Sequence, residues 1–490
     1  LGNVFGTSNL VWANIIGLIL VYLTAGYFIG GRWADRSPQA RTFYQLLAWA
    51  AFSAGLVPLA SRPVLRFAAE AVANFDAAVA IGSFGAVLIL FSVPVTLLGC
   101  VSPFAIRLAL KDVNAAGNTA GRMYAISTLG SIVGTFTPVL VLIPSIGTAR
   151  TFLLFSGVLL AIALGGLFAA DRRRALLYLL MPAVLLILAI AFLRGPLKPT
   201  TGMIYETESA YNYIQVVQRD GTRYLLLNEG QGIHSVYNPD TLVTGGTWDF
   251  FLVAPFFNAP PHAPSQVKSL ALIGLAGGTI ARQYTAVFGP IPIDGIEIDP
   301  AVVQVGRDYF AMTERNLNVI VEDGRYALNR SRGRYSVIGV DAYRLPYIPW
   351  QLTTREFFEA VRAHLTDDGA LVINVGRTNK DRRLIEAMAG TLRAVFPSVY
   401  VVDVPQSFNS ILYATVQPTQ AKNLHLNLAA FGAGTHPLLY DSIARAIVNL
   451  QPTPESTTVF TDDVAPIEQL TNSIVIQFVL GGEMHELSPN

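Results

Sequence analysis

The chain has 490 residues, of which 52% are hydrophobic and only 14% are charged, so it exceeds one typical domain and is too apolar for an ordinary soluble protein. Residues 1–200 carry 14 Lys and Arg against 5 Asp and Glu, a net of +9, whereas the remainder carries 20 against 28, a net of −8. The acidic part lacks the basic stripe of a nucleic-acid-binding protein, and the single cysteine, Cys100, excludes an intrachain disulfide or a cysteine-based zinc site. Composition therefore predicts a basic membrane region followed by a soluble region without a nucleic-acid partner.

Six apolar segments in the first part are long enough to cross a bilayer. Small residues such as Gly130 and Gly134 predict close helix packing, and Pro94, Pro103 and Pro138 predict kinks. The segments lack the central Asp, Glu or Lys that marks an ion route, so a compact helical anchor is favoured over a transport path. The segments are 9–31, 43–61, 78–106, 123–143, 151–170 and 175–193.

The second part alternates predicted strands and helices. After a proline-containing linker, the runs at 211–218 and 223–228 predict a small β subdomain. Further strands interleaved with helical patterns predict an α/β fold, a Rossmann-like doubly wound sheet of the methyltransferase type. These strands are expected at 269–273, 293–298, 317–321, 335–340, 370–375 and 399–404, with one tail helix near 437–449.

Four regions follow from these patterns. They are a transmembrane helical domain at 1–200, the small β subdomain at 201–264, the Rossmann-like domain at 265–418, and a C-terminal tail at 419–490 packed on it. The chain begins with Leu1, so a preceding signal or first helix is expected to be missing.

A glycine-rich turn is the most informative motif of the soluble part. It follows a buried strand in LALIGLAGGTIARQYTAVFGPIPIDGIEIDP, residues 270–300. Gly274, Gly277 and Gly278 would let the backbone approach a ligand closely, and Glu297, 23 positions after Gly274, could accept hydrogen bonds from ribose hydroxyls. The layout predicts a nucleoside-binding unit.

Two arguments conflict on which side of the membrane this unit lies. Loops 32–41, 107–122 and 171–174 hold nine Lys or Arg against five on the other side, which predicts that these loops are cytoplasmic and the soluble region is outside. A nucleoside ligand favours the cytoplasmic side of a bacterial-type inner membrane instead, and on chemical grounds we expect that placement.

The chain resembles the spermidine synthases, especially relatives in which an integral-membrane helical region precedes the synthase-like domain. The order and spacing of several short motifs carry the resemblance. They are GGRWADR (30–36), RMYAISTLGSIVGT (122–135), ESAYNYIQV (208–216), IGLAGGT (273–279), IEID (296–299), EDGR (322–325) and TTREFF (353–358).

The resemblance implies roles for acids at the strand ends. Glu297 and Asp299 of the IEID run would bind S-adenosylmethionine or its decarboxylated form, with Glu297 at the ribose, and Asp323 and Gly324 would lie by the adenine. Asp341 would be the catalytic base that deprotonates an attacking amine. Methylthioadenosine would be the leaving group, and no metal is implied.

Three positions depart from the family pattern. Arg344 stands where the second carboxylate of the D-x-x-D run belongs, and Gly277 replaces the aspartate that pairs with the terminal amine of the cosubstrate. Asp249, in GTWDFF, is at best a shortened substitute for the amine-binding Y-x-E acid. Three anchors for positive charge are therefore missing. Arg344 could pair with Asp341, or bind the carboxylate of an intact methionine-type cosubstrate.

Other polar residues have alternative interpretations. His234 and Tyr343 are candidates for substrate binding, although a lone histidine is more often structural. The adjacent acids of TDDV, 461–464, resemble a metal site but serve more often as turn formers and helix caps.

Three functions remain open at this point. The first is a membrane-embedded transferase that moves the alkyl chain of a sulfonium nucleoside to an acceptor such as an amine. The second is a decayed synthase-like domain with a structural or sensory role in a membrane complex or a homo-oligomer. The third, a transporter, rests only on the likeness of GGRWADR to a loop of major-facilitator carriers.

Overall fold

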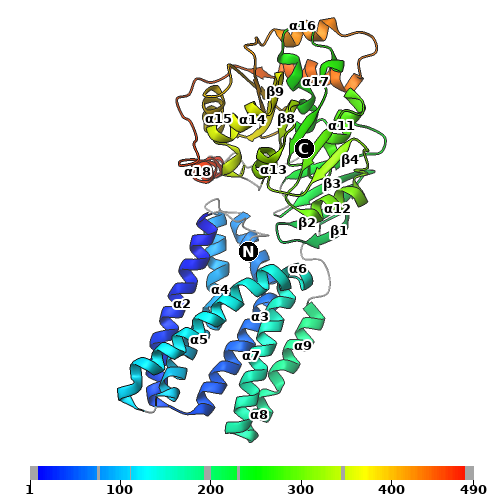
Figure 1. Cartoon of the computed structure of the whole chain (residues 1–490). Coiled ribbons are helices and arrows are strands. Elements are labelled where there is room, and N and C mark those ends of the chain that lie inside the picture. Colours follow the sequence, from blue (N-terminus) through cyan, green and yellow to red (C-terminus); the bar gives the residue numbers. More distant parts are fainter. Residues whose placement is uncertain are drawn as a thin grey trace. The chain divides into compact units, whose positions relative to one another are not determined.

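The structure is a computed structural model of the chain (Figure 1), and it describes residues 9–73, 78–110, 112–192, 200–228, 232–343 and 348–480. The chain divides into two compact units. The first runs to Pro199 and takes in Glu208–Ala210, and the second holds the rest from Thr200 onward. Each unit is described by itself below.

The first unit is helical. Six of its stretches are long and apolar enough to cross a membrane, by length and composition: Trp12–Arg36, Ala40–Ser61, Phe84–Ala109, Ala116–Ile146, Thr148–Ala170 and Arg172–Phe192. Helix α3 packs against both α4 and α7, and α4 also packs against α2. The long helices are α2 (Asn9–Arg36), α3 (Ala40–Ala73), α4 (Ala78–Ala109), α5 (Ala116–Thr137), α7 (Thr148–Ala170), and α8 (Arg172–Tyr178) followed by α9 (Leu180–Phe192).

Close helix packing occurs between α2 and α4 rather than at the predicted glycines of α5. A Cβ on Gly26 would overlap the backbone of α4 near Gly99, and one on Gly30 would overlap Cys100. In contrast, a Cβ on Gly130 or Gly134 would meet no atom within 4 Å. Gly130 and Gly134 therefore have no close helix neighbour among the described residues of this chain, because spacing alone does not tell which helix lies opposite.

At Pro138, where a kink was predicted, the regular α-helix ends. Helix α5 ends at Thr137, and a π-helical turn, η2 (Pro138–Leu142), leads into the short α6 (Ile143–Ile146). Proline has no N–H and its ring clashes with the preceding turn, which favours such a rearrangement. Helix α4, however, continues through Pro94 and Pro103.

The second unit begins with a four-stranded sheet in the order β1-β2-β3-β4. Asp220 and Gly221 connect β2 to β3, and both have positive φ, 47° and 78°, as a tight hairpin turn requires. The strands are β1 (Met203–Glu208), β2 (Tyr213–Arg219), β3 (Thr222–Leu227) and β4 (Ile233–Tyr237).

The main sheet has eight strands in the order β12-β10-β11-β9-β8-β5-β6-β7. The five strands from β9 to β7 are parallel, whereas β11 is antiparallel to both of its neighbours. The strands are β5 (Leu270–Ile273), β6 (Ile293–Ile296), β7 (Leu317–Ile320), β8 (Tyr335–Val340), β9 (Leu365–Gly376), β10 (Ser398–Asp403), β11 (Asn409–Thr415) and β12 (Leu450–Gln451). The Rossmann-like prediction is confirmed, but the antiparallel edge was not foreseen. The short connection between β10 and β11 permits only antiparallel pairing.

Alternate residues of the central strands enter two different cores. Ala271 and Ile273 of β5 belong to one cluster, and Leu270 and Leu272 to the other. Because side chains alternate along a strand, both faces of the sheet are covered (Figure 1). Residues of α13 (Gly324–Arg330), α14 (Arg355–Ala363) and α15 (Arg383–Arg393) lie in the first cluster, and residues of η3 (Phe251–Phe257) and α11 (Thr279–Phe288) in the second.

The C-terminal tail contains more structure than one predicted helix. The expected helix is present as α17 (Pro437–Val448), but α16 (Asn423–Ala430), α18 (Ile467–Leu480) and β12 also occur. Leu424 of α16 joins the second core, and Ile474 of α18 joins the first. These short elements are fixed by packing on the sheet, which their own sequences do not reveal.

The parallel strands bring four of the predicted polar or glycine positions to one edge. Gly274 follows β5, Glu297 follows β6, Asp323 lies three residues beyond β7, and Asp341 follows β8. Strand β5 lies between β6 and β8, so the chain reverses its direction across the sheet next to β5. Ligands of such sheets bind outside the carboxyl ends of the strands at this reversal point.

Candidate active site

The glycine-rich turn brings the end of β5 against the end of β8. Gly274 has φ of 89°, and a Cβ there would overlap the carbonyl group of Asp341. The N–H of Asp341 donates to the carbonyl oxygen of Ile273 at 2.8 Å. Gly278, with φ of 86°, is the N-cap of α11. Only glycine fits the first position, because any side chain would push the two strand ends apart.

Gly277 is tightly enclosed. Its N–H donates to Oγ of Ser235 at 2.8 Å, and a Cβ would lie 3.0 Å from the Cβ of Ser235 and 3.1 Å from the ring of Phe310. An aspartate at this position would require both neighbours to move. The surroundings of Gly277 therefore leave no room for the aspartate that the resemblance leads one to expect at this position.

Glu297 faces the turn from the end of β6 and is half-buried. Its Oε2 accepts from the N–H of Ala276 at 3.0 Å, and its Oε1 accepts from the N–H of Asp299 at 3.1 Å. Burial raises the pKa of Glu297, while these backbone hydrogen bonds oppose the rise. Each carboxylate oxygen still has a lone pair for a further donor, so ribose hydroxyls could bind here.

Asp299 has a structural role instead of the predicted nucleoside contact. It is fully buried, and its Oδ1 caps α12 (Pro300–Tyr309) by accepting from the N–H of Ala301 at 2.9 Å. Its Oδ2 accepts from the side chain of Asn212 at 2.8 Å. The structure therefore does not support the expectation that Asp299 binds the cosubstrate.

Asp323 and Gly324 form the start of α13. Oδ1 of Asp323 accepts from the N–H groups of Arg325 and Tyr326, both at 3.0 Å, as an N-cap does. A Cβ on Gly324 would overlap the side chain of Ile273 on β5. This glycine lets α13 begin directly against the central strand, which keeps Asp323 at the edge of the sheet.

A two-point ion pair ties this turn to the C-terminal tail. Both terminal nitrogens of Arg325 donate to the carboxylate oxygens of Asp462 at 2.7 Å, and Oγ1 of Thr354 donates to the same carboxylate at 2.7 Å. Asp462, an acid of the TDDV run, thus holds a loop of the tail beside the Asp323 turn. Backbone hydrogen bonds between Thr461 and Val464 agree with the prediction that this run forms a turn. The ion-pair partner of Asp462, Arg325, lies 137 positions away in sequence and was not predicted.

A pocket of about 120 Å³ opens beside Asp341. It contains three predicted residues, His234, Asp341 and Tyr343, and several that the sequence did not single out. Its described lining is Gly232, Ile233, His234, Thr247, Trp248, Asp341, Tyr343, Asn374 and Asn409. Residues from β4, β9, β11 and α10 (Thr247–Phe250) therefore converge on the predicted base, which follows β8.

Asp341 is held in place by Asn374. The side-chain amide of Asn374 donates to Oδ1 of Asp341 at 2.9 Å, which lowers the pKa of Asp341, but burial outweighs this and raises it to about 6. A carboxylate with a pKa near neutrality can take a proton during a reaction and release it afterwards. Asn374 could have been noticed as the lone polar residue in the apolar run ALVINV at the end of β9.

Tyr343 and His234 flank the acid. The hydroxyl of Tyr343 donates to the carbonyl oxygen of Asn374 at 3.1 Å, and burial with the nearby charge of Asp341 raises its pKa well above the ordinary value. Burial lowers the pKa of His234 to about 4, so its imidazole is neutral at physiological pH. Neither side chain adds a charge to the pocket at neutral pH.

Asp249 does not serve the pocket. It is fully buried and accepts from the backbone and hydroxyl of Thr244, the N–H of Gly245, the amide of Gln283 and the guanidinium of Arg445. These donors occupy both of its oxygens, so the structure does not support Asp249 as a substitute for an amine-binding acid. Its neighbour Trp248 lines the pocket instead.

The remaining predictions concern Arg344 and metal binding. Arg344 lies outside the described residues. Within the described ranges, no group of three or more His, Cys, Asp and Glu side chains is arranged to hold a metal ion.

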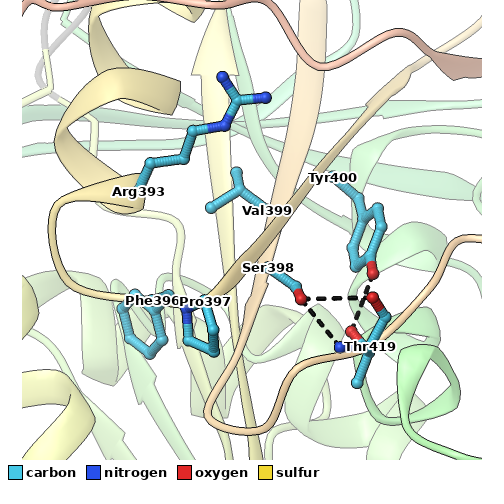
Figure 2. A pocket seen from close by; sticks show the side chains of 7 residues that line it. All are labelled: Arg393, Phe396, Pro397, Ser398, Val399, Tyr400 and Thr419. Atoms are coloured by element: carbon cyan, nitrogen blue, oxygen red, sulfur yellow. Dashed lines mark hydrogen bonds between the residues drawn. The ribbon is translucent and has the colours of Figure 1, made fainter.

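An open hollow of about 470 Å³ lies elsewhere on the sheet, at the start of β10 (Figure 2). Its polar groups bond to one another: the N–H of Thr419 donates to Ser398, and Tyr400 shares a hydrogen bond with the Thr419 hydroxyl. Arg393 donates to two backbone carbonyls of the tail. With its donors and acceptors satisfied, this hollow offers no chemistry comparable to the pocket at Asp341.

Comparison with known proteins agrees with this geometry. Residues 258–426 match the model of the spermine/spermidine synthase domain. This stretch is a spermine/spermidine synthase domain. The synthase domain includes Glu297, Asp323, Asp341 and Asn374, whereas His234 precedes it in the small sheet.

Polyamine aminopropyltransferases are among the similar proteins. The chain is 29% identical over 294 residues to a probable polyamine aminopropyl transferase of Bifidobacterium longum, covering 57% of this chain and 64% of that protein. It is 28% identical over 242 residues to a polyamine aminopropyltransferase of Vibrio vulnificus, covering 46% and 76%. A solved probable spermidine synthase from Corynebacterium glutamicum is 18% identical with a TM-score of 0.41, covering 53% of this chain and 99% of that one.

Proposed function

We propose that the protein is a membrane-anchored transferase that binds a sulfonium nucleoside at the edge of the main sheet and transfers its alkyl chain to an amine. The observation that carries the proposal is the pocket at Asp341, where a half-buried carboxylate with a pKa of about 6 is held by Asn374. The match to the spermine/spermidine synthase domain supports the same reaction class.

The nucleoside would bind along the ends of β5, β6 and β7. The positive φ of Gly274 and Gly278 lets the backbone turn beside the ligand, and Glu297 has lone pairs free for the ribose hydroxyls. The carboxylate of Asp323 lies three residues beyond β7, at the start of α13, where an exocyclic amine could donate to it. This arrangement leaves the sulfonium end of the ligand directed toward the neighbouring strand end, β8.

The chemistry would be a direct displacement. Asp341 accepts a proton from the attacking amine, the nitrogen lone pair forms a bond to the carbon next to sulfur, and the carbon–sulfur bond breaks. The bond electrons return to sulfur, so methylthioadenosine leaves as a neutral molecule. The protein contributes alignment and a base, and alignment alone accounts for a large part of the rate in such reactions.

Two features bear on which cosubstrate binds, and they point in opposite directions. The relatives are aminopropyltransferases by name, which favours decarboxylated S-adenosylmethionine. In contrast, Gly277 lacks the aspartate that would hold the terminal amine of the alkyl chain, and its surroundings leave no room for one. We favour the decarboxylated form, with intact S-adenosylmethionine as the competing candidate.

The helical unit would anchor this activity in a membrane. The six apolar stretches support the anchor by length and composition. We propose that the synthase domain lies on the cytoplasmic side of a bacterial-type inner membrane, because its nucleoside is made there. The loop charges argue for the other side, so topology requires a direct measurement.

The decisive experiment is calorimetric titration of the detergent-purified full chain with decarboxylated S-adenosylmethionine, S-adenosylmethionine and methylthioadenosine. Glu297→Ala should weaken binding of all three by about 100-fold, because hydrogen bonds to a charged group are lost. Glu359→Ala on the exposed face of α14 is the matched control and should bind like the wild type.

The outcomes separate the competing functions. Preference for the decarboxylated form supports aminopropyl transfer, and preference for the intact form indicates a different alkyl group. If none of the three nucleosides binds, the transferase proposal fails and the decayed, structural or sensory domain becomes the better description.

A further inference from the structure

Asn374 presents a buried acceptor that no described residue satisfies. Its side chain is 7% exposed, and its Nδ2 donates to Oδ1 of Asp341 at 2.9 Å. Because a carboxylate accepts hydrogen bonds, this contact fixes the orientation of the amide and leaves Oδ1 as its free end. That oxygen has no hydrogen-bond partner among the described residues. A buried carbonyl oxygen in this state is uncommon, and a bound water molecule is a frequent partner of such an atom.

Asp341 offers a second acceptor at the same place. Its Oδ1 is bonded to Asn374, and the described chain contains no other hydrogen bond to this carboxylate. Both side chains line one pocket of about 120 Å³, which is large enough for several water molecules. A water molecule has two O–H donors, so a single one can donate to Oδ1 of Asn374 and to the carboxylate of Asp341.

The rest of the pocket suits an uncharged molecule. Apart from Asp341, its described side chains carry no charge at neutral pH, since burial lowers the pKa of His234 to about 4. A doubly charged diamine would therefore lack a partner for its second charge among these residues, and an unpaired buried charge is costly. Nε2 of His234 also lacks a partner in the described chain, and water can bond to it in either tautomer because water both donates and accepts.

We propose that the protein has a second activity, hydrolysis of the sulfonium nucleoside, in which a water molecule held between Asn374 and Asp341 attacks the carbon next to sulfur. This inference rests on the proposed function, because the nucleoside and the base are the same. The acids that would hold a cationic chain are absent, since Gly277 has no side chain and Asp249 is fully engaged by other donors. Water as the nucleophile needs neither of them.

The hydrolytic step is again a displacement at carbon. The water molecule gives one proton to Asp341 while a lone pair of its oxygen forms a bond to the carbon next to sulfur. The carbon–sulfur bond breaks, its electron pair returns to sulfur, and methylthioadenosine leaves as a neutral molecule. With decarboxylated S-adenosylmethionine the other product is 3-amino-1-propanol, and Asp341 then releases its proton to solvent. Asn374 accepts the second O–H of the water and so keeps its oxygen aligned with the carbon.

The test is incubation of the detergent-purified full chain with decarboxylated S-adenosylmethionine in oxygen-18 water at pH 8, without an added amine. At this pH Asp341 is ionised, since its pKa is about 6. Methylthioadenosine should form about 100-fold or more faster than in a protein-free blank, which is the usual contribution of a positioned base. Mass spectrometry should find one oxygen-18 atom in each molecule of 3-amino-1-propanol, formed in equal amount with methylthioadenosine.

Two variants connect this activity to the pocket. Asp341→Asn should slow hydrolysis by about 100-fold, because the base is lost. Asn374→Leu should slow it by about 10-fold, because one hydrogen bond to the water is lost. Both variants should bind methylthioadenosine with wild-type affinity in calorimetry, which reports on the fold of the site. Asn318→Leu is the matched control and should hydrolyse at the wild-type rate, since the amide of Asn318 is exposed and likewise donates to an aspartate, Asp294, at 2.8 Å.

The outcomes separate this inference from the proposed function. If the nucleoside does not bind, or releases no methylthioadenosine with or without 1,4-diaminobutane, the proposed function fails and the inference fails with it. If methylthioadenosine forms only when the amine is added, the transferase stands and the inference alone is overturned. Release of methylthioadenosine without oxygen-18 in the amino alcohol also overturns it, because the chain would then leave by elimination or cyclisation. A wild-type rate of hydrolysis in Asn374→Leu would show that the attacking water is not held at this amide.

Discussion

Replacing Asp341 by asparagine should stabilise the second unit at neutral pH. Burial raises the pKa of Asp341 from the usual 3.8 to about 6, so the folded protein binds its proton more tightly than the unfolded chain. Between these two pKa values, stability falls as pH rises, and above pH 6 the whole cost of the buried charge is present. At about 1.36 kcal/mol per pKa unit the cost is about 3 kcal/mol. Because Asp341 keeps part of its surface open to the pocket, we expect about 1–3 kcal/mol.

Asp341→Asn removes this cost and keeps the contact to Asn374, because the amide oxygen of the new side chain can accept the same hydrogen bond. The measurement is the melting temperature of the full chain in detergent at pH 8 and at pH 4. At about 2–4 °C per kcal/mol, the variant should melt about 2–12 °C higher at pH 8 and about the same as the wild type at pH 4. Asp367→Asn, at an exposed ion pair with Arg334, is the control and should change little at either pH.

A variant that melts at or below the wild-type temperature at pH 8 would refute this reasoning. Asp341 would then gain more from its surroundings than it loses by burial, and it would have the low pKa of a paired carboxylate. Such a result would also weaken its assignment as the base, since that role depends on a pKa near neutrality.

Three further predictions address activity, packing and topology. The rate of methylthioadenosine release should fall as pH drops below about 6, because protonated Asp341 cannot accept a proton; a flat profile from pH 5 to 8 would contradict this. Gly324→Ala should lower the melting temperature by an amount equivalent to about 1–3 kcal/mol and weaken nucleoside binding, because the added methyl overlaps β5, whereas Gly432→Ala in open space should do neither. In a cysteine-free background, single cysteines at Arg173 and Glu455 should react with a membrane-impermeant maleimide from opposite faces, because one candidate span separates them. Labelling from the same face would rule out that span.

The strand ends were predictable because the signal for them is local. A short apolar run followed by glycine or an acid marks the end of a buried parallel strand, and this pattern correctly indicated the ends of β5 and β8, whereas β6 ends at Ile296, two residues before the predicted end at 298. The stretch of chain between Gly274 and Glu297 is long enough for one helix, α11, that connects the neighbouring strands β5 and β6. The structure accordingly brings both residues to the same edge.

Whether a polar side chain is free for a ligand was not predictable, because its partners are distant in sequence. Asp249 is occupied by Gln283 and by Arg445, which lies 196 positions away, and Asp299 is occupied by Asn212. Asn374 was missed for the converse reason: its neighbours along the chain are apolar, and only the fold brings it to Asp341. Local patterns locate the edge of the sheet, whereas long-range contacts decide which groups there remain available.

Under the proposed function, the ion pair between Arg325 and Asp462 links the C-terminal tail to the affinity for the nucleoside. Arg325 follows directly after the Asp323–Gly324 turn, so the loop at 461–464 acts as a brace on the predicted adenine end of the site. A chain shortened before this loop could keep every residue assigned to the nucleoside and still hold its ligand poorly. The matched domain ends at residue 426, before the loop that carries this ion pair, so under the same proposal the nucleoside site extends beyond the matched range.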